Sequence, residues 1–405
     1  MTAERKKHNH ILVCIGDFIK KETILTVALL LAAVSMFLIP PSAVYMDYID
    51  WNTIFLLFDL MAVVAGFQKL GVFSLIGSAL LGKIHTSRQL AFILVFLPFF
   101  FSMLITNDVA LITFVPFAMI VLRLSGKEQL LLPIVVLQTL AANLGSMLMP
   151  MGNPQNLYLY TLSEMALSDF IKLMFPLFSL SAVILFLAVF FIKNTPVEMM
   201  SEKAQSFSHI PPEPADELAD KPQTAQNQRF GFPLLSYSIL LILCILCVLK
   251  YFPPLWLTGI ICLYLLIWDR GLFQKIDYSL LATFIGFFIF IGNISRIETF
   301  RTALQGVVAS HEIPVAILSS QIISNVPAAL LLSGFTDRYA ALLIGVNLGG
   351  LGTLIASMAS LISYKQIARE YPNKKKSYLG FFTCANLIVL GILYGVVLFL
   401  PLYFF

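Results

Sequence analysis

Residues 104–117 read LITNDVALITFVPF, and residues 322–335 read IISNVPAALLLSGF. Each segment places a hydroxyl residue and an asparagine, Thr106-Asn107 and Ser324-Asn325, inside a long apolar run. Two further blocks repeat in the same chain order, because IDWNTIFLLFDLMAVVAGF (49–67) matches IDYSLLATFIGFFIFIGNI (276–294) and AANLGSMLMPMGNPQN (141–156) matches GVNLGGLGTLIASMAS (345–360). Since the polar residues that interrupt these apolar runs repeat together with the apolar residues, the sequence predicts an internal duplication.

The composition around these blocks is typical of a membrane protein. Of the 405 residues, 59% are hydrophobic and 12% are charged, whereas soluble domains carry about 25% charged residues. We expect spans of about 20 residues, the length that crosses a bilayer, near 51–68, 129–149, 170–192, 232–250, 254–268, 278–294, 339–363 and 378–404. The predicted fold is therefore an all-α polytopic membrane protein with about 10–11 transmembrane helices.

The chain also divides into units along its length. The first apolar run, TILTVALLLAAVSMFLI (23–39), follows basic residues and has the form of a signal peptide or of a retained helix. The lack of a small-residue cleavage site and the many later spans favour a retained helix. A polar stretch rich in proline and acid predicts a flexible linker. The expected units are a cytoplasmic tail (1–22), a first transmembrane repeat (23–192), a cytoplasmic linker (193–231) and a second transmembrane repeat (232–405).

The positions of lysine and arginine predict the orientation in the membrane. The basic N-terminus is expected in the cytoplasm, and the loop at 40–50, which has no positive residue, is expected outside. Both ends of the stretch 89–122 are basic, so we interpret it as a re-entrant hairpin with Asn107 near its tip. By the same count the second repeat starts inside, whereas the first starts outside at Asp50. The two repeats are therefore expected to have inverted topology, and the re-entrant hairpin around Ser324-Asn325 is expected to enter the membrane from the outer side.

Each repeat also contains a span that is expected to be discontinuous. NLGS (143–146) runs into MPMGNPQN (149–156), and NLGGLGT (347–353) is its counterpart. Proline removes a backbone donor and glycine permits positive φ, so both stretches should unwind. Freed helix N-termini can bind an anion, while carbonyls and asparagine side chains can coordinate a cation. Close helix packing explains either stretch alone equally well, but the paired occurrence favours a binding role.

Two carboxylates lie inside apolar segments. Asp108 follows Asn107 at the first tip, and because a charge at membrane depth costs about 2.5–3.5 kcal/mol, it should face a cavity and bind a cation or titrate. Capping of the following helix is the alternative. Its counterpart at the second tip is Val326, so the two tips differ chemically. Asp59, whose counterpart is Gly286, is a candidate proton relay, and an interhelical hydrogen bond explains it equally well.

These motifs resemble those of the ion-transporter superfamily that groups divalent-anion/sodium symporters, citrate permeases, arsenite permeases and a class of sodium/proton antiporters. The resemblance rests on the paired hairpins and the NLGSMLMPMGNPQN and NLGGLGT stretches, and it covers nearly the whole chain outside the tail and linker. It implies a homodimer in which each protomer has a scaffold and a mobile transport domain that moves like an elevator. The similar dicarboxylate symporters carry Ser-Asn-Thr at both tips, whereas Asp108 and Val326 hold the third position here. The Asn-Asp pair is more similar to the arsenite-permease and antiporter branches.

We therefore expect a secondary active transporter of the inner or plasma membrane that moves a small anion, either a di- or tricarboxylate or an inorganic oxyanion, with coupling to H⁺ or Na⁺. Arsenite efflux and Na⁺/H⁺ exchange are the alternatives. The expected substrate-binding residues are Thr106, Asn107, Gly152, Asn153, Ser324, Asn325, Gly349 and Thr353. The expected cation-coupling residues are Asp108, Asn107, Asn143, Asn156, Asn325 and Asn347.

Other classes of function have less support in the sequence. The net charge of +4 arises from basic clusters between apolar stretches, so nucleic acid is not an expected partner. The five cysteines and five histidines form no disulfide or metal pattern, no ATP-binding motif is present, and the coupling ion is the only expected cofactor. An intramembrane aspartyl protease using Asp59 and Asp108 is the alternative from another class. It requires the two carboxylates to lie within hydrogen-bonding reach, and we do not expect an enzyme.

Overall fold

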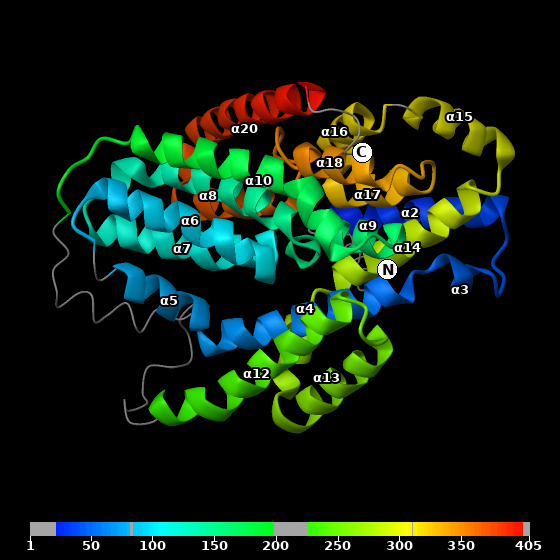
Figure 1. Cartoon of the computed structure of the whole chain (residues 1–405), viewed down its shortest axis with the longest axis horizontal. Coiled ribbons are helices and arrows are strands. Elements are labelled where there is room, and N and C mark those ends of the chain that lie inside the picture. The colour runs from blue at the N-terminus through cyan, green and yellow to red at the C-terminus, as the bar shows by residue number, and fades with distance from the viewer. Residues whose placement is uncertain (1–21, 82–83, 198–225, 310, 400–405) are drawn as a thin grey trace, which may run out of the picture.

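The computed structural model describes residues 22–81, 84–197, 226–309 and 311–399 (Figure 1). These residues form helices, with short 3₁₀ turns between some of them, and one isolated β-bridge joins Thr86 to Pro196. Most of the predicted linker 193–231 lies outside the described residues, and a helix already begins within it at Gln226.

Eighteen α-helices are described, nine before the linker and nine after it. The first nine are α2 (Thr23–Leu38), α3 (Tyr45–Tyr48), α4 (Trp51–Leu70), α5 (Val72–Leu81), α6 (Ser87–Ile105), α7 (Asn107–Leu124), α8 (Leu131–Gly145), α9 (Pro154–Ser163) and α10 (Leu167–Phe190). The other nine are α12 (Gln226–Val248), α13 (Pro254–Trp268), α14 (Tyr278–Ile294), α15 (Glu298–Val308), α16 (Glu312–Ile323), α17 (Asn325–Ser333), α18 (Tyr339–Gly349), α19 (Met358–Glu370) and α20 (Lys375–Phe399).

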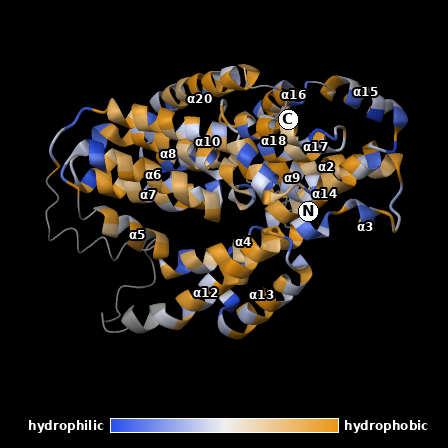
Figure 2. Ribbon diagram, viewed as in Figure 1, coloured by the Kyte–Doolittle hydropathy of each residue, from blue (hydrophilic) through white to orange (hydrophobic). Residues whose placement is uncertain are grey.

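The helices have the length and composition of membrane spans. Seven of the described helices are long and apolar enough to cross a bilayer, and the count is eight if α14 and α15, which bend by 109°, form one span. Four shorter apolar helices, α2, α13, α16 and α18, accompany them. Figure 2 shows hydrophobic residues along the helices and hydrophilic residues concentrated toward their ends. The chain is therefore a multi-span helical membrane protein, as its composition predicts.

The two hairpins differ in length. The arms of the first, α6 and α7, have 19 and 18 residues, and each is long enough by itself to cross a bilayer. The arms of the second, α16 and α17, have 12 and 9 residues, which is shorter than the roughly 20 residues that a span requires. The re-entrant course of both hairpins stays a prediction.

The matching sequence blocks adopt matching local structures. Asp50 and Asp277 are the N-caps of α4 and α14, with φ/ψ of −75°/86° and −80°/83°, and each carboxylate accepts a hydrogen bond from a backbone N–H three residues later. Both predicted discontinuous spans are broken, between α8 and α9 and between α18 and α19. The helices after the breaks have N-caps with nearly equal backbone angles, −146°/146° at Asn153 and −143°/138° at Ser357.

The packing between the halves is reciprocal. Helix α2 packs against α14 of the other half, while α12 and α13 pack against α4. In the same way α7 packs against α19, and α17 packs against α9. The first hairpin, α8 and α10 form one layer of adjacent helices, at the left in Figure 1. Such mutual exchange of partners is expected of two repeats, while their direction in the membrane stays a prediction.

Charged and polar segments at the helix ends contact one another. Lys69 at the end of α4 forms an ion pair with Asp269 before η6 (Arg270–Lys275), with Nζ and Oδ1 2.6 Å apart. Lys127 donates a hydrogen bond to the hydroxyl of Thr195 at 2.9 Å, and the Ser87 N–H donates to the carbonyl of Thr195 at 2.8 Å. These contacts join α4 to the segment before η6, and the two ends of the first hairpin to the segment after α10, while the side of the membrane on which they lie stays a prediction.

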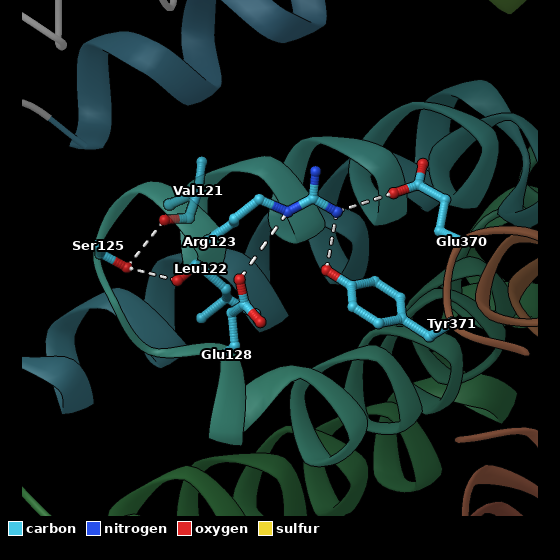
Figure 3. A network of polar contacts seen from close by, with 7 residues as sticks. All are labelled: Val121, Leu122, Arg123, Ser125, Glu128, Glu370 and Tyr371. Atoms are coloured by element: carbon cyan, nitrogen blue, oxygen red, sulfur yellow. Dashed lines mark hydrogen bonds and ion pairs between the residues drawn. The ribbon is translucent and has the colours of Figure 1, made fainter. Parts of the chain in front are cut away.

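Arg123 connects two more of these segments at the end of the first hairpin (Figure 3). Its Nη2 donates to the hydroxyl of Tyr371 at 2.9 Å and to Glu370 at 3.3 Å, and its Nε lies 3.9 Å from Glu128. The partners Glu370 and Tyr371 lie at the C-terminal end of α19, so this network ties α7 to the second half. The arginine is half-exposed, and such a pair contributes about 0–1 kcal/mol to stability.

Candidate functional site

One residue forms the tip of each hairpin. Thr106 joins α6 to α7 with φ/ψ of 67°/151°, and Ser324 joins α16 to α17 with 74°/156°. Positive φ is rare for residues other than glycine, and such strained positions cost about 1–3 kcal/mol and cluster at ligand sites. Asn107 and Asn325 follow, and each side-chain oxygen accepts a hydrogen bond from the next backbone N–H, at 2.9 and 3.0 Å. The two tips therefore share one backbone geometry.

The first tip is bonded to both broken spans through Asn143. The Asn107 amide donates to Oδ1 of Asn143 at 2.9 Å, and the hydroxyl of Ser357 donates to the same oxygen at 3.1 Å. Asn143 belongs to α8 and Ser357 is the N-cap of α19, so the two bonds connect the halves. All three side chains are at most 5% exposed. A hydrogen-bonded polar group thus lies in an otherwise apolar core.

The two broken spans are also joined directly. The amide of Asn347, near the end of α18, donates to Oδ1 of Asn156 in α9 at 2.7 Å. Asn156 donates to the carbonyl of Ser146 at 3.3 Å, and Asn153 donates to the hydroxyl of Ser146 at 2.7 Å. Asn347 is thus bonded to the first half just as Asn143 is bonded to the second.

The second tip lies against the break before α19. The backbone N–H of Asn325 donates to the carbonyl of Ala356 at 2.9 Å, and the hydroxyl of Ser324 lies 3.4 Å from the same oxygen. An added Cβ at Gly350 would lie 2.9 Å from Nδ2 of Asn325. The structure therefore brings Asn325 to the backbone of the second break, whereas Asn107 contacts a side chain of the first.

We call the buried group formed by both tips and both breaks the tip network. Its polar members are Asn107, Asn143, Ser146, Asn153, Asn156, Ser324, Asn325, Asn347 and Ser357. Three of its side-chain atoms, Oδ1 of Asn153, Oδ1 of Asn347 and Nδ2 of Asn143, are buried and have no hydrogen-bond partner among the described residues. Because buried polar atoms are normally paired, these three atoms have capacity for a ligand.

Four helices begin at the tip network. Helices α7 and α17 begin at the two tips, and α9 and α19 begin directly after the two breaks. Four other helices, α6, α8, α16 and α18, end there. Helix N-termini carry partial positive charge and free N–H groups, while C-termini present carbonyl oxygens. The arrangement can therefore bind an anion and a cation side by side.

Gly152, Gly349 and Thr353 lie at the breaks, and their role in substrate binding stays a prediction. Gly349 packs tightly against Ser320 of α16, and its carbonyl accepts a hydrogen bond from Gln321 at 3.0 Å. Thr353 is exposed, and its N–H donates to Oε1 of Gln321 at 2.8 Å. Gly152 is buried against the carbonyl of Ser146. These three positions shape the breaks, and they form no hydrogen bond to either tip asparagine in the described structure.

The two carboxylates occupy different surroundings. Asp108 is in the first turn of α7, and its Oδ1 is buried with no hydrogen-bond partner among the described residues. Asp59 is fully buried in α4, and its Oδ2 accepts a hydrogen bond from Thr258 of α13 at 3.0 Å. Within the described residues no hydrogen bond joins the two carboxylates, so the geometry that a protease dyad requires is missing.

Three residues that contact the breaks, Ser146, Ser357 and Gln321, are not among the site residues that the sequence predicts. Ser146 is part of the NLGS stretch (143–146), and Ser357 aligns with Asn153 in the repeat. The alignment of the two blocks therefore indicates both serines as candidates. Gln321, three residues before the second tip, donates to the carbonyls of Gly349 and Leu351 at 3.0 and 2.9 Å. Its counterpart in the repeat is the apolar residue Met103, so the alignment gives no reason to select Gln321.

Comparisons with known proteins agree with this architecture. A family model described as citrate transporter matches residues 18–337. An uncharacterized transporter of Methanocaldococcus jannaschii is 32% identical over 323 residues, covering 78% of this chain and 81% of the relative. The inner membrane protein YbiR of Escherichia coli is 30% identical over 325 residues, covering 78% of this chain and 80% of the relative. A putative transporter of Dictyostelium discoideum, arsB, is 24% identical over 31% of this chain and 22% of its own length.

The family match includes the first repeat and reaches the end of the second hairpin. It agrees with the resemblance seen in the tip and break motifs, and the relatives that match most of the chain are named as a transporter and as an inner membrane protein. This chain belongs to the citrate transporter family and is a membrane transporter rather than an enzyme.

Proposed function

We propose that the chain is a secondary active transporter that moves a small anion, either a di- or tricarboxylate or an inorganic oxyanion, coupled to H⁺ or Na⁺. The observation that carries this proposal is the tip network, in which both tips and both breaks are hydrogen-bonded in the buried core. Irregular backbone at membrane depth is tolerated where it lines a cavity or binds a ligand. The proposed binding groups are the tip asparagines, Asn107 and Asn325, and the helix N-termini beside them.

The helix ends support an anionic substrate. Four N-termini begin at the tip network, and each places partial positive charge there. The described residues of the network include no arginine or lysine, so the backbone and the amide donors supply the attraction. Amides bind an anion without a fixed charge of their own, which favours release as well as binding. A transporter requires both steps in every cycle.

The oxygen atoms support a cation beside the anion. Oδ1 of Asn153 and Oδ1 of Asn347 are buried and unpaired among the described residues, and Na⁺ is a hard ion that suits such oxygen ligands. Asp108 provides a carboxylate at the first tip, where the second tip has Val326. We propose that Asp108 binds the coupling ion, either H⁺ or Na⁺, and that the oxygens of Asn153 and Asn347 are further candidate ligands for Na⁺.

The helix packing supports movement of one part against the other. Helices α2, α4, α12, α13 and α14 pack among themselves, and the hairpins pack against the broken spans. Between the two groups, Tyr158 of α9 contacts the rings of Phe284 and Phe288 of α14, with centroids 6.2 and 5.5 Å apart. Aromatic rings without fixed charge suit a sliding interface. We propose that the first group is the scaffold and the second the mobile unit of an elevator, in a homodimer as the resemblance implies.

Uptake into proteoliposomes tests the proposal. Citrate, succinate, sulfate and arsenite are presented in turn under an imposed pH gradient or Na⁺ gradient, and the internal solute is measured against empty liposomes. We expect one anion to accumulate under one of the gradients. Arsenite movement without carboxylate movement would favour the efflux alternative, and proton movement driven by Na⁺ alone would favour the antiporter. If no solute or ion moves, the proposal is wrong.

Replacing Asp108 with asparagine separates coupling from binding. The variant keeps a hydrogen-bonding side chain at the start of α7 and removes the charge. We expect gradient-driven accumulation to be lost, while exchange of solute at equal ion concentration on both sides persists. The matched control is Asp169→Asn, which removes an exposed carboxylate from the first turn of α10. Accumulation at the wild-type level in Asp108→Asn would remove this residue from the coupling site.

A further inference from the structure

A groove of about 600 Å³ lies between α5, α6 and α10, and none of its lining residues belongs to the tip network. Its wall is apolar over most of its length and includes Leu80, Phe92, Phe186 and Phe190. These four side chains are 40–51% exposed, so the surface is open to its surroundings. The volume lies within the range of about 300–1,000 Å³ that is usual for small-molecule sites.

The groove has one polar end, which lies beside the start of α6 and the end of α10. Thr86, Arg88 and Gln89 line it where α6 begins, and Asn194 lines it just after α10 ends. Both helices are candidate membrane spans, so we expect this end at the boundary between hydrocarbon and water. The segment after α10 is held there, because the N–H of Val197 donates to the carbonyl of His85 at 3.0 Å.

Arg88 gives the polar end a positive charge that no described acid neutralises. Its Nε and Nη2 face one backbone carbonyl, that of Ile192, at 3.4 and 3.3 Å, and its guanidinium carbon lies 4.6 Å from the centre of the Phe190 ring. Arginine has five N–H donors, so the guanidinium keeps capacity for further acceptors. The described lining contains no aspartate or glutamate, and among the described residues no carboxylate forms an ion pair with Arg88.

The second hairpin has no such feature at the corresponding end, as far as the structure describes it. Its first arm, α16, begins with Glu312, which is 3% exposed on its side chain and pairs with Arg338 at 3.3 Å. The first hairpin therefore begins with an arginine, Arg88, that pairs with no described carboxylate, whereas the second begins with a glutamate, Glu312, that is neutralised by Arg338. A ligand attracted by charge would therefore bind at only one of them.

We propose that the groove binds one anionic phospholipid, with its phosphate at Arg88 and an acyl chain along the wall formed by Phe92, Phe186 and Phe190. An apolar groove whose lining has, at its polar end, one cation that no described acid neutralises complements a lipid in both shape and charge. The N-terminus of α6 adds partial positive charge at the same end. Lys193, which is exposed next to Asn194, adds a second positive charge near the headgroup. Basic pockets between transmembrane helices bind anionic headgroups in the same manner.

Quenching of a tryptophan in the groove by brominated lipid tests this proposal. Phe186→Trp places the reporter, in a background where Trp51, Trp256 and Trp268 are replaced by phenylalanine. The purified transporter is reconstituted with brominated phosphatidylglycerol or brominated phosphatidylcholine of the same acyl chains. We expect quenching at a lower mole fraction of the anionic lipid. Adding Arg88→Gln should reduce this preference about fivefold, the size expected for one basic residue at an anionic surface.

Two further variants, each added to the reporter protein, make the result decisive. Arg301→Gln removes an exposed arginine from α15, and it should leave the preference unchanged. Leu80→Phe adds a ring to the wall of the groove without adding a second fluorescent reporter, and it should weaken quenching by both lipids. Equal quenching by the two lipids, or a preference that survives Arg88→Gln, would overturn the proposal. A cross-link between two copies through Leu80→Cys would overturn it as well, because a second copy would then cover the groove.

Discussion

Gln138 shows how one polar side chain supports the first hairpin. Pro98 lies inside α6 and has no N–H, so it leaves the carbonyl of Leu94 without its helical partner. The amide of Gln138, fully buried in α8, donates to that carbonyl at 2.8 Å and lies 3.3 Å from the carbonyl of Phe114 in α7. One side chain thus connects the first broken span to both arms of the hairpin.

A double-mutant cycle tests this role. In Pro98→Ala the new N–H can bond Leu94, so Gln138→Leu should cost less stability there than in the native background. We expect the two costs to differ by about 1 kcal/mol, since an unsatisfied buried carbonyl costs about 1–3 kcal/mol. Denaturant unfolding of the four proteins in detergent measures the difference. Additive effects of the two substitutions would show that Gln138 does not serve the carbonyl released by Pro98.

At the scale of elements, one glycine in each half lets a broken span approach its hairpin. A Cβ at Gly145 would clash with the backbone carbonyl of Phe99 in α6, and a Cβ at Gly349 would clash with the side-chain hydroxyl of Ser320 in α16. The two positions align in the sequence repeat, and each follows an Asn-Leu pair. Close contact between α8 and α6 and between α18 and α16 therefore depends on the missing side chain.

Alanine at these positions should separate the helices. We expect Gly145→Ala to destabilise the protein by about 1–3 kcal/mol. The nearest atom to the new methyl group is the backbone oxygen of Phe99, which cannot move away without shifting α6. Gly391→Ala in α20 is the control, since a Cβ there meets no described atom within 4 Å, and alanine should stabilise that helix by about 0.5–1 kcal/mol. The free energy of unfolding in detergent measures both. A Gly145→Ala protein as stable as the control would contradict the close approach.

The elements that the sequence predicted share a local cause. Hairpin tips and broken spans arise from residues whose chemistry is visible in a short window, and each motif occurs twice in the chain. The contacts of Asn143 with Ser357 and of Asn347 with Asn156 join residues about 200 positions apart, and no short window contains them. Gln138 was predictable in part, because a polar residue in an apolar span is a functional candidate.

At the scale of the whole molecule, the two halves depend on each other. Helix α2 of the first half packs against α14, and α12 and α13 of the second half pack against α4, while the second arm of each hairpin packs against the last part of the other half's broken span. The tip network continues this exchange in side chains, because Asn143 and Asn347 each bond to the opposite half. Neither half could complete the tip network alone, because the hydrogen bonds of Asn143 and Asn347 need a partner from the opposite half.

We propose that the tip asparagines bind the transported solute, and the initial uptake rate per folded transporter in proteoliposomes measures their contribution. Asn107→Ala and Asn325→Ala are compared with Asn386→Ala, which removes a buried asparagine of α20 whose amide donates to the carbonyl of Phe382 in its own helix. We predict that each tip variant loses at least about tenfold in rate, since a hydrogen bond to a charged group contributes about 1.5–3 kcal/mol, while Asn386→Ala stays close to the wild type. Tip variants as active as Asn386→Ala would contradict the account.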